Sequence, residues 1–354
     1  MFSQPPEVTD EMLDQALWAG WRFRAATLTY QPVGFGAHHW LGEDTSGWQL
    51  FITVDDLAAR TWSAQDTIEA AFSRLERAMA TAFSLRHDAG LEFVVAPIQA
   101  ADGRTLHRMS DRYSIVTHPY LADCEPGRDG DFAAEADRRA VIALLQTLHG
   151  VSGVVLPRPD DLTVPQIAQL KAAMSRTREP WQRGPYGTRA RDLLAAHVED
   201  LAALLVAFGR LAARVAGRAD RLVITHGEPG AANVLRTPRG FVFVDWESVL
   251  LAQPERDLWA LAEDDPEILT HYSERTGVAI DTDALTAYRL WYDLFEIAGY
   301  ITWFEGTHED NLDTAEAWQN LQHFLQPADR WPDLVGPAKS GRRDLVELDV
   351  LESD

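Results

Sequence analysis

Cysteine and long apolar runs are scarce in this sequence. The 354 residues contain one cysteine, Cys124, which excludes an internal disulfide framework and a cysteine-rich zinc site. No apolar run reaches the ~18 residues that a membrane-spanning helix needs. Residues 1–10 also lack the basic and then apolar pattern of a secretory signal. We therefore expect a cytoplasmic protein that has no membrane partner.

Basic residues are also few relative to acidic ones. The chain has 32 Lys and Arg residues against 54 Asp and Glu residues, which gives a formal net charge of −22. This charge argues against binding to nucleic acid, whose phosphates require basic partners. It is compatible with a cationic small-molecule partner, although a solvated acidic surface explains the same excess. Only two lysines occur, Lys171 and Lys339, so the first 170 residues have none.

The most informative segment covers residues 222–259. An apolar run at 222–225 precedes a polar loop, and Pro238-Arg239-Gly240 predicts a hairpin turn. A second apolar run, 241–244, leads directly into Asp245-Trp246-Glu247. The two predicted strands therefore bring the polar loop and the acidic triplet to one end of a hairpin. Carboxylate and amide oxygens gathered there could hold a metal–phosphate group, because hard cations take oxygen ligands.

The same segment is similar to the catalytic segment of the aminoglycoside phosphotransferase family, whose members are relatives of the protein kinases. The family has a His-Gly-Asp-x-x-x-x-Asn loop, which corresponds here to residues 226–233, with Glu228 in place of the family's Asp. Its metal-binding Asp triplet corresponds to 245–247. A further family segment of the form Asp-Pro-x-x-Asp-Leu is similar to residues 253–258, Gln-Pro-Glu-Arg-Asp-Leu.

This resemblance implies a role for each matching residue. Asn233 and Asp245 would bind Mg²⁺ that bridges the phosphates of ATP or GTP. Glu228 would be the catalytic base that accepts the proton of the substrate hydroxyl. His226 would orient the loop by hydrogen bonding, and Asp257 would brace it. The extra methylene of Glu moves a carboxylate by roughly 1 Å, and a misplacement of that size can cost on the order of 10²-fold in rate.

The first third of the chain resembles the nucleotide-binding part of such proteins. Strands are predicted at 27–33 and 48–54, and the turn between them contains Gly34 and Gly36, where backbone N–H groups could approach phosphates. An ordinary hairpin turn is the alternative. Thr53 falls about where the family has a phosphate-gripping lysine, so either an arginine replaces that lysine or nothing does.

A helix is predicted at 65–83, and it would carry the acidic partner of that lysine. Glu69 and Glu76 are the candidates, although both also fit a solvated face. Further strands are predicted at 91–98 and 113–117. The segment that follows, which includes His118 and Tyr120, resembles the hinge between the lobes, whose backbone would hydrogen-bond the adenine.

The second lobe is predicted to be mostly helical. The expected helices are 132–149, 163–177, 188–216 as one long or two abutting helices, 258–262, 283–305 and a last segment at 318–325. Helix 283–305 carries many aromatic residues together with Asp293 and Glu296, which share its surface. These two carboxylates could bind an ammonium group with help from cation–π contacts. An ordinary packed helix with a polar flank is the alternative.

These observations predict a two-lobed, protein-kinase-like α+β fold, with a small antiparallel-sheet lobe at 1–121, a helical lobe at 122–335 and a disordered tail at 336–354. The predicted function is ATP- and Mg²⁺-dependent O-phosphotransfer to a hydroxyl of a small, cationic, aminoglycoside-like molecule. Thr53 and Glu228 leave open a nucleotide-binding pseudokinase or scaffold. A kinase for a metabolite, such as an amino alcohol or a sugar, is a further alternative.

Overall fold

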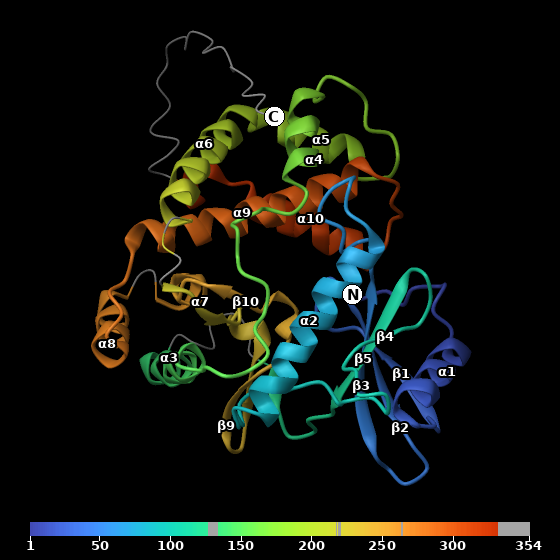
Figure 1. Ribbon diagram of the computed structural model, residues 1–354. Coiled ribbons are helices and arrows are strands. Elements are labelled where there is room, and N and C mark those ends of the chain that lie inside the picture. Colours follow the sequence, from blue (N-terminus) through green and yellow to red (C-terminus); the bar gives the residue numbers. More distant parts are fainter. Residues whose placement is uncertain (127–133, 217, 219–220, 263–264, 332–354) are drawn as a thin grey trace, which may run out of the picture.

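The computed structural model describes residues 1–126, 134–216, 218, 221–262 and 265–331. Within them, a small sheet lobe packs beside a larger helical lobe, as Figure 1 shows. This is the predicted two-lobed α+β arrangement. The predicted tail, 336–354, lies outside the described residues, and the lobe boundary at 122 stays a prediction. No helix among the described residues is both long and apolar enough to cross a membrane.

The small lobe is a five-stranded antiparallel sheet in the order β1-β2-β3-β5-β4. Side chains at alternate positions of β3, Leu50, Ile52 and Val54, are buried on one face. Helix α1 lies near the edge strand β4, and its Leu13 and Leu17 belong to the same apolar cluster. The elements are α1 (Asp10–Trp21), β1 (Thr27–Gln31), β2 (His38–Glu43), β3 (Gln49–Asp56), β4 (His107–Arg108) and β5 (Tyr113–Pro119).

Residues 48–54 form the predicted strand, β3, but its pairing and a second strand prediction were wrong. The strand that returns from the glycine turn is β2, whose first residues, 38 and 39, were predicted to lie in a turn at 34–39, and β3 is the next strand along. Gly42 obscures β2 in the sequence, yet a Cβ there would lie 2.8 Å from Cδ1 of Ile52, so any larger residue would have to displace this buried side chain. Residues 91–98 form no regular strand. Their backbone bonds to two different sheets. Val95 N donates to Phe243 O and Phe93 O accepts from Phe243 N, while Ile98 N donates to Thr117 O.

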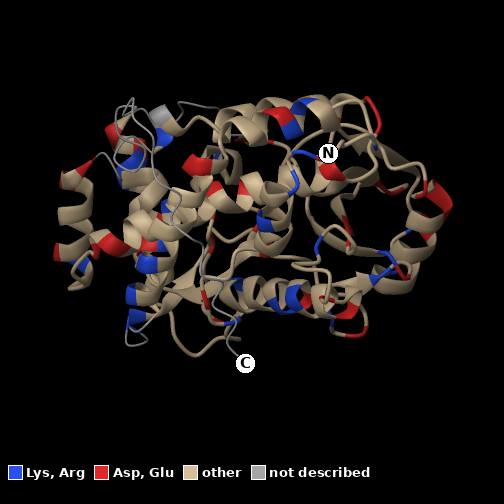
Figure 2. Ribbon diagram, turned by 90° about the horizontal axis from the view of Figure 1, so that it is seen from above, with Lys and Arg blue, Asp and Glu red and all other residues tan. Residues whose placement is uncertain are grey.

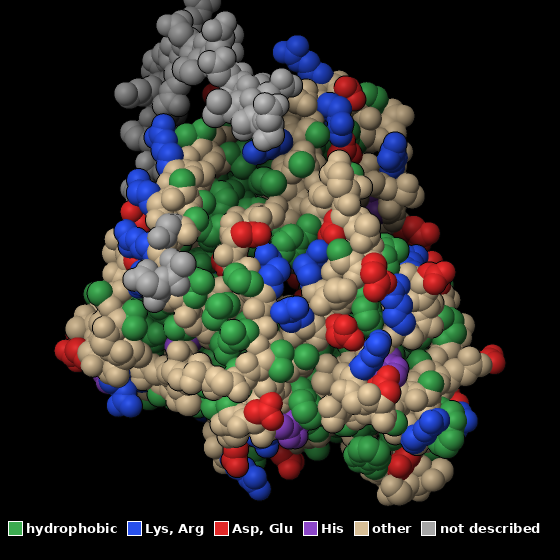
Figure 3. Space-filling view, viewed as in Figure 1, with side chains coloured by type: hydrophobic (Ala, Val, Ile, Leu, Met, Phe, Trp, Pro, Cys, Tyr) green, Lys and Arg blue, Asp and Glu red, His purple; other side chains and the backbone are tan. Residues whose placement is uncertain are grey.

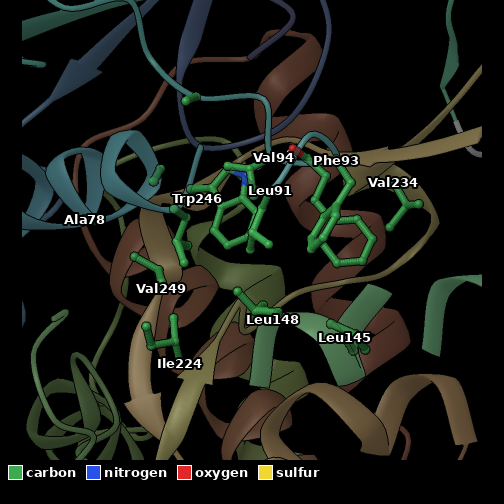
Figure 4. Close-up of a cluster of buried hydrophobic side chains, with 14 of the residues drawn as sticks. Ala78, Leu91, Phe93, Val94, Leu145, Leu148, Ile224, Val234, Trp246 and Val249 are labelled. Carbon is green, nitrogen blue, oxygen red and sulfur yellow. Dashed lines mark hydrogen bonds between the residues drawn. The ribbon is translucent and has the colours of Figure 1, made fainter. Parts of the chain in front are cut away.

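Helix α2 (Ile68–His87) connects the two lobes through a shared core. Thr67 begins the helix, since its hydroxyl accepts a hydrogen bond from Ala70 N. Its buried side packs near Trp246 of the acidic triplet, and Figure 4 shows Ala78 of this helix beside Trp246 and Val94. The triplet is therefore fixed in the apolar core by its central residue.

The helical lobe is built around α9 (Thr282–Glu305), which packs against α4, α5, α6, α7 and α10. The predicted helix 188–216 is two abutting helices that meet at His197. Helix α8 was not predicted. The remaining helices are α3 (Glu135–His149), α4 (Ile167–Ser175), α5 (Gly187–Ala196), α6 (Val198–Val215), α7 (Glu255–Ala262), α8 (Pro266–Thr276), α10 (Leu312–Phe324) and α11 (Pro327–Arg330). Figure 2 shows acidic and basic residues interspersed over both lobes.

The strands around the polar loop pair differently from the prediction. The run at 222–225 forms β7 (Val223–Thr225), which pairs with β10 (Leu250–Ala252). The Pro-Arg-Gly turn does join a hairpin, but its strands are β8 (Val234–Thr237) and β9 (Gly240–Phe243), and β8 also pairs with β6 (Glu125–Pro126). The polar loop thus connects two small sheets.

Candidate active site

Asp257, at the start of α7, anchors the polar loop that follows β7. Its carboxylate is completely buried and accepts hydrogen bonds from His226 N at 2.9 Å and Gly227 N at 2.6 Å. The ring of His149 lies 3.0 Å from the same carboxylate. Burial alone would raise the pKa of Asp257, but the hydrogen bond and charge of His149 outweigh it and lower that pKa. Asp257 therefore lies where the predicted bracing role needs it.

Gly227 is a loop position at which a side chain would have to displace a buried neighbour. Its φ is +102°, and a Cβ there would lie 2.4 Å from Nη1 of Arg256. Arg256 is itself buried, and its Nη1 donates to the hydroxyl of Thr225 at 3.0 Å. The guanidinium thus packs directly on the loop backbone.

His226 links the loop to the end of β9. Its Nε2 donates to Val244 O at 2.8 Å, and its Nδ1 accepts from Glu228 N at 3.3 Å, which together define a neutral tautomer. Burial lowers the pKa of His226 and favours that neutral form. Both ring nitrogens are occupied by backbone groups, so the geometry suits orientation of the loop rather than proton transfer.

Asn233 and Asp245 lie at adjoining ends of β8 and β9, where Val244 N donates to Asn233 O at 3.0 Å. The side-chain nitrogen of Asn233 donates to Glu228 O at 3.0 Å, which fixes the orientation of its amide and of Oδ1. Asp245 has φ of 60° and ψ of 65°, a left-handed conformation that costs on the order of 1 kcal/mol and turns the carboxylate out of the strand path.

The surroundings of Asp245 suit a divalent cation. Burial, followed by the charges of Glu247 and Glu228, raises the pKa of Asp245 well above its ordinary value. A cation relieves this repulsion, and Mg²⁺ accepts one or two protein oxygens with phosphate and water oxygens completing its shell. The described residues contain no group of three His, Cys, Asp or Glu side chains that could hold a metal alone. Asn233 and Asp245 therefore fit a metal that arrives with a phosphate.

Glu228 lies in the same loop as Asn233, and its backbone carbonyl accepts the hydrogen bond from the Asn233 amide. Burial and the charge of Glu247 raise its pKa, against the opposing charges of Arg256 and Arg60. Its own charge contributes to the raised pKa of both Asp245 and Glu296. Glu228 therefore interacts electrostatically with both Asp245 and Glu296.

The structure separates the two acidic residues predicted on α9. Burial raises the pKa of Glu296 to about 7, and hydrogen bonds from Tyr300 and Tyr292 oppose the rise. Asp293, in contrast, is fully buried and pairs with Arg330, whose Nε lies 3.1 Å away, and with Trp331 Nε1 at 2.7 Å. Arg330, the last residue of α11, already neutralises the charge of Asp293, which argues against the prediction that Asp293 contacts substrate.

The glycine turn between β1 and β2 lies over β2 and contacts α9. Gly34 and Gly36 both have positive φ, of 69° and 105°. Between them, Phe35 packs 6.0 Å from the ring of Tyr300 and 5.8 Å from that of Trp303. The turn of the small lobe is thus in contact with the helix that carries Glu296.

The other nucleotide-binding candidates lie on or after the neighbouring strands. The hydroxyl of Thr53 lies 3.2 Å from Nδ1 of His39 on β2. His118 is in β5, where burial lowers its pKa to about 4, and Tyr120 is exposed after the strand. Glu69 and Glu76 pair instead with exposed arginines, Arg108 at 2.5 Å and Arg104 at 3.9 Å, as a solvated face predicts.

Comparison with known proteins supplies the family. Residues 70–300, well over half of the chain, match the model of the phosphotransferase enzyme family. The chain belongs to this family. Protein StrN of Streptomyces griseus is 30% identical over 253 residues, which cover 68% of this chain and 74% of StrN. The resemblance predicted from residues 226–258 is confirmed.

Solved structures confirm the kinase-like fold of this phosphotransferase. A spectinomycin phosphotransferase solved with ADP and spectinomycin superposes with a TM-score of 0.67 at 15% identity, covering 92% of this chain and 99% of that one. The choline kinase LicA from Streptococcus pneumoniae gives 0.53 at 14% identity, covering 89% and 98%. An amicoumacin kinase gives 0.53 at 12% identity, covering 90% and 93%.

One charged residue near the phosphotransferase motif had no predicted role. Arg60, in the segment between β3 and α2, contacts both Asp55 and Glu247. The absence of lysine from the first 170 residues was the available signal, since it required an arginine if any cation was to serve there. Spacing along the chain could not select Arg60, because it lies beyond the strand rather than on it.

Proposed function

We propose that this phosphotransferase uses ATP or GTP with Mg²⁺ to phosphorylate a hydroxyl of a small, cationic molecule. The observation that carries the proposal is the loop that holds Glu228 beside Asn233, whose amide nitrogen donates to Glu228 O at 3.0 Å, with Asp245 and Glu296 within electrostatic reach of Glu228. The relatives with this fold include proteins named for spectinomycin, choline and amicoumacin, and one was solved with ADP, which supports a small-molecule acceptor and a nucleotide donor.

Asn233 and Asp245 would hold the magnesium ion, which supplies neutralisation of phosphate charge when bound. Glu228 would accept the proton of the acceptor hydroxyl as that oxygen bonds to the γ-phosphorus and the nucleoside diphosphate departs. The raised pKa of Glu228 makes it a stronger base than an exposed carboxylate. His226, Gly227 and Asp257 keep the backbone of Glu228 in place for this transfer.

Glu296 would bind the positive group of the acceptor. A cation placed beside it favours the ionised carboxylate, which burial otherwise disfavours. The rings of Tyr292, Tyr300 and Phe35 lie around this position and can add cation–π attraction. Two carboxylates, Glu228 and Glu296, thus favour an acceptor that carries a positive group near its reactive hydroxyl.

Glu228→Gln tests the assignment of the base. We expect ADP release to fall by about 10²–10⁴-fold while the Kd for nucleotide changes little, because general-base catalysis contributes about that much and the base faces the acceptor. Glu228→Asp keeps a carboxylate and should retain part of the turnover. Glu69→Gln is the control, because it removes one exposed carboxylate elsewhere.

Acceptors for this test are amine-bearing alcohols and neutral sugars of similar size. Equal ADP release by wild type and Glu228→Gln with every acceptor would show that Glu228 is not the base. Nucleotide binding without ADP release for any acceptor would favour the pseudokinase alternative.

A further inference from the structure

The nucleotide region of the small lobe has no lysine to hold phosphates. Thr53 takes the place that the family resemblance gives to a lysine on β3, and its hydroxyl lies against His39. His39 is not a replacement cation, because burial lowers its pKa to about 3. A positive group must therefore come from another element if phosphate is to be held by a side chain of this lobe.

Arg60 is placed where such a group is needed. A Cβ built on Gly36 would lie 4.0 Å from its Nη2, so the guanidinium lies beneath the glycine turn. Its Nη1 pairs with Glu247 of the acidic triplet, 187 residues along the chain, and its Nη2 lies 2.6 Å from Asp55. The guanidinium thus lies between the glycine turn and the predicted metal ligands.

The backbone around Arg60 is held from both lobes. Its carbonyl accepts a hydrogen bond from Nη2 of Arg74 on α2 at 3.0 Å. Two residues on, Trp62 O accepts from Gln166 N of the helical lobe at 2.6 Å. The Trp62 ring also lies under the guanidinium groups of Arg74 and Arg158, at 4.4 and 4.7 Å. Figure 3 shows basic side chains gathered near the middle of the face that includes α2.

Arg60 retains an unused hydrogen-bonding capacity. Its Nε is buried without a hydrogen-bond partner among the described residues. Its two carboxylate partners differ, since Asp55 is 2% exposed and Glu247 is 28% exposed. Burial alone would lower the pKa of Arg60, but the charges of Glu247 and Asp55 outweigh it, so the group stays charged. The pair with Glu247 is therefore the one more readily exchanged for another anion.

We propose that Arg60 is the phosphate-binding cation of this enzyme, and that Glu247 holds its guanidinium until a nucleotide takes it over. The guanidinium fork suits phosphate oxygens, which it can contact through two N–H groups at once. Asp55 remains its partner throughout and fixes its position. The proposal rests on the nucleotide site proposed above, and it adds the residue that grips the phosphates and the contact that restrains it beforehand.

The first experiment compares the binding of ADP and of adenosine by calorimetry, with and without Mg²⁺. Arg60→Met should weaken ADP binding by about 10- to 100-fold, or about 1.4–2.8 kcal/mol, and leave the Kd for adenosine unchanged. Arg60→Lys should restore part of the loss. Arg112→Met is the matched control, because it removes an equal charge from an exposed pair with Asp56.

Unchanged ADP affinity in Arg60→Met overturns the proposal and leaves the proposed enzymatic function intact. An equal loss of ADP and adenosine binding also overturns it, since that result marks damage to the fold. Arg60→Met leaves the buried carboxylate of Asp55 without its cationic partner. The double variant Arg60→Met/Asp55→Asn is therefore measured too, and the same ADP-selective loss is expected. If the wild type binds neither ligand, the proposed function fails together with this inference.

A second experiment addresses the restraint by Glu247. Glu247→Gln should strengthen ADP binding several-fold in the absence of Mg²⁺, because it frees the guanidinium. The gain should disappear in the Arg60→Met background, which gives a coupling energy between the two residues. An equal effect of Glu247→Gln in both backgrounds would show that Glu247 acts through general repulsion of anions, and the restraint would be wrong.

Discussion

Carboxylates of one chemical kind behave differently at this site because their surroundings differ. Asp257 is surrounded by hydrogen-bond donors, and its pKa is lowered even though it is fully buried. Burial and the charges of neighbouring carboxylates raise the pKa values of Asp245, Glu228 and Glu296. The first residue therefore stabilises the fold as an anion, whereas the other three store repulsion that a metal ion or a cationic ligand can relieve.

The titration of Glu296 gives a test by pH. Its pKa is about 7 in the folded protein against an ordinary value of 4.5. The stability that its bound proton contributes is therefore fully present below pH ~4.5 and is lost as pH rises through ~7. Glu296→Gln removes this dependence. We expect the variant to gain about 1–3 kcal/mol over wild type between pH 5 and pH 8, measured by urea unfolding. A stability difference that stays constant over this range would contradict the assignment.

Asp257→Asn tests the brace. The substitution removes the charge that faces His149 and places an NH₂ group among the backbone donors of His226 and Gly227. Breaking a buried charged contact typically costs about 3–5 kcal/mol, and we expect a loss of that order in the free energy of unfolding. Asp14→Asn, which alters an exposed pair with Arg24, should change it little. Equal effects of the two substitutions would argue against the brace.

At the scale of elements, the polar loop gains its shape from contacts with two other parts of the chain. α7 supplies Asp257 and Arg256, and the end of β9 supplies the carbonyl of Val244. His149 of α3 in turn contacts Asp257. The loop itself connects β7 and β8, which belong to separate small sheets. Each sheet is too small to fix the loop alone, so these contacts determine where Glu228 and Asn233 lie.

Gly227→Ala tests this packing, with Gly240→Ala as its matched control. Both glycines have positive φ, 102° and 118°, so both changes carry a similar backbone penalty. Only at Gly227 would the new Cβ meet Arg256, while nothing lies within 4 Å at Gly240. We expect Gly227→Ala to cost about 1–3 kcal/mol more in unfolding free energy and to reduce ADP release, as overpacking predicts. If the two substitutions lower the unfolding free energy equally, the side chain of Arg256 moves away from the new Cβ without cost.

At the scale of the whole molecule, the two lobes are in contact at several points of the site. Phe35 meets α9, Arg60 meets Glu247, and Trp62 meets Gln166. These contacts place the glycine turn, the acidic triplet and Glu296 within one region although they are far apart in sequence. A ligand bound there would interact with both lobes.

Nucleotide should therefore stabilise the entire protein. At a concentration 100 times its Kd, Mg²⁺–ADP should add about 2.7 kcal/mol to the unfolding free energy, because it binds only the folded state. Asp245→Asn should reduce the Mg²⁺-dependent part of this gain. Stabilisation by adenosine, which has no phosphate, should not depend on Mg²⁺. The measurement is thermal unfolding at fixed protein concentration. Stabilisation by Mg²⁺–ADP that is equal in wild type and Asp245→Asn would remove Asp245 from the metal site.

The sequence by itself determined the motif, the family and the two-lobed fold. Order and spacing suffice for these, because residues 226–233 lie in one loop and 245–247 follow one strand. Tertiary structure decided which charged side chains are already paired within the protein and which can bind a ligand. Asp293 is neutralised by Arg330, 37 residues away, whereas Arg60 reaches Glu247 across 187 residues. Such partners are chosen by packing between distant elements, so no local pattern could have shown that one carboxylate is occupied and that an arginine beyond β3 faces the site.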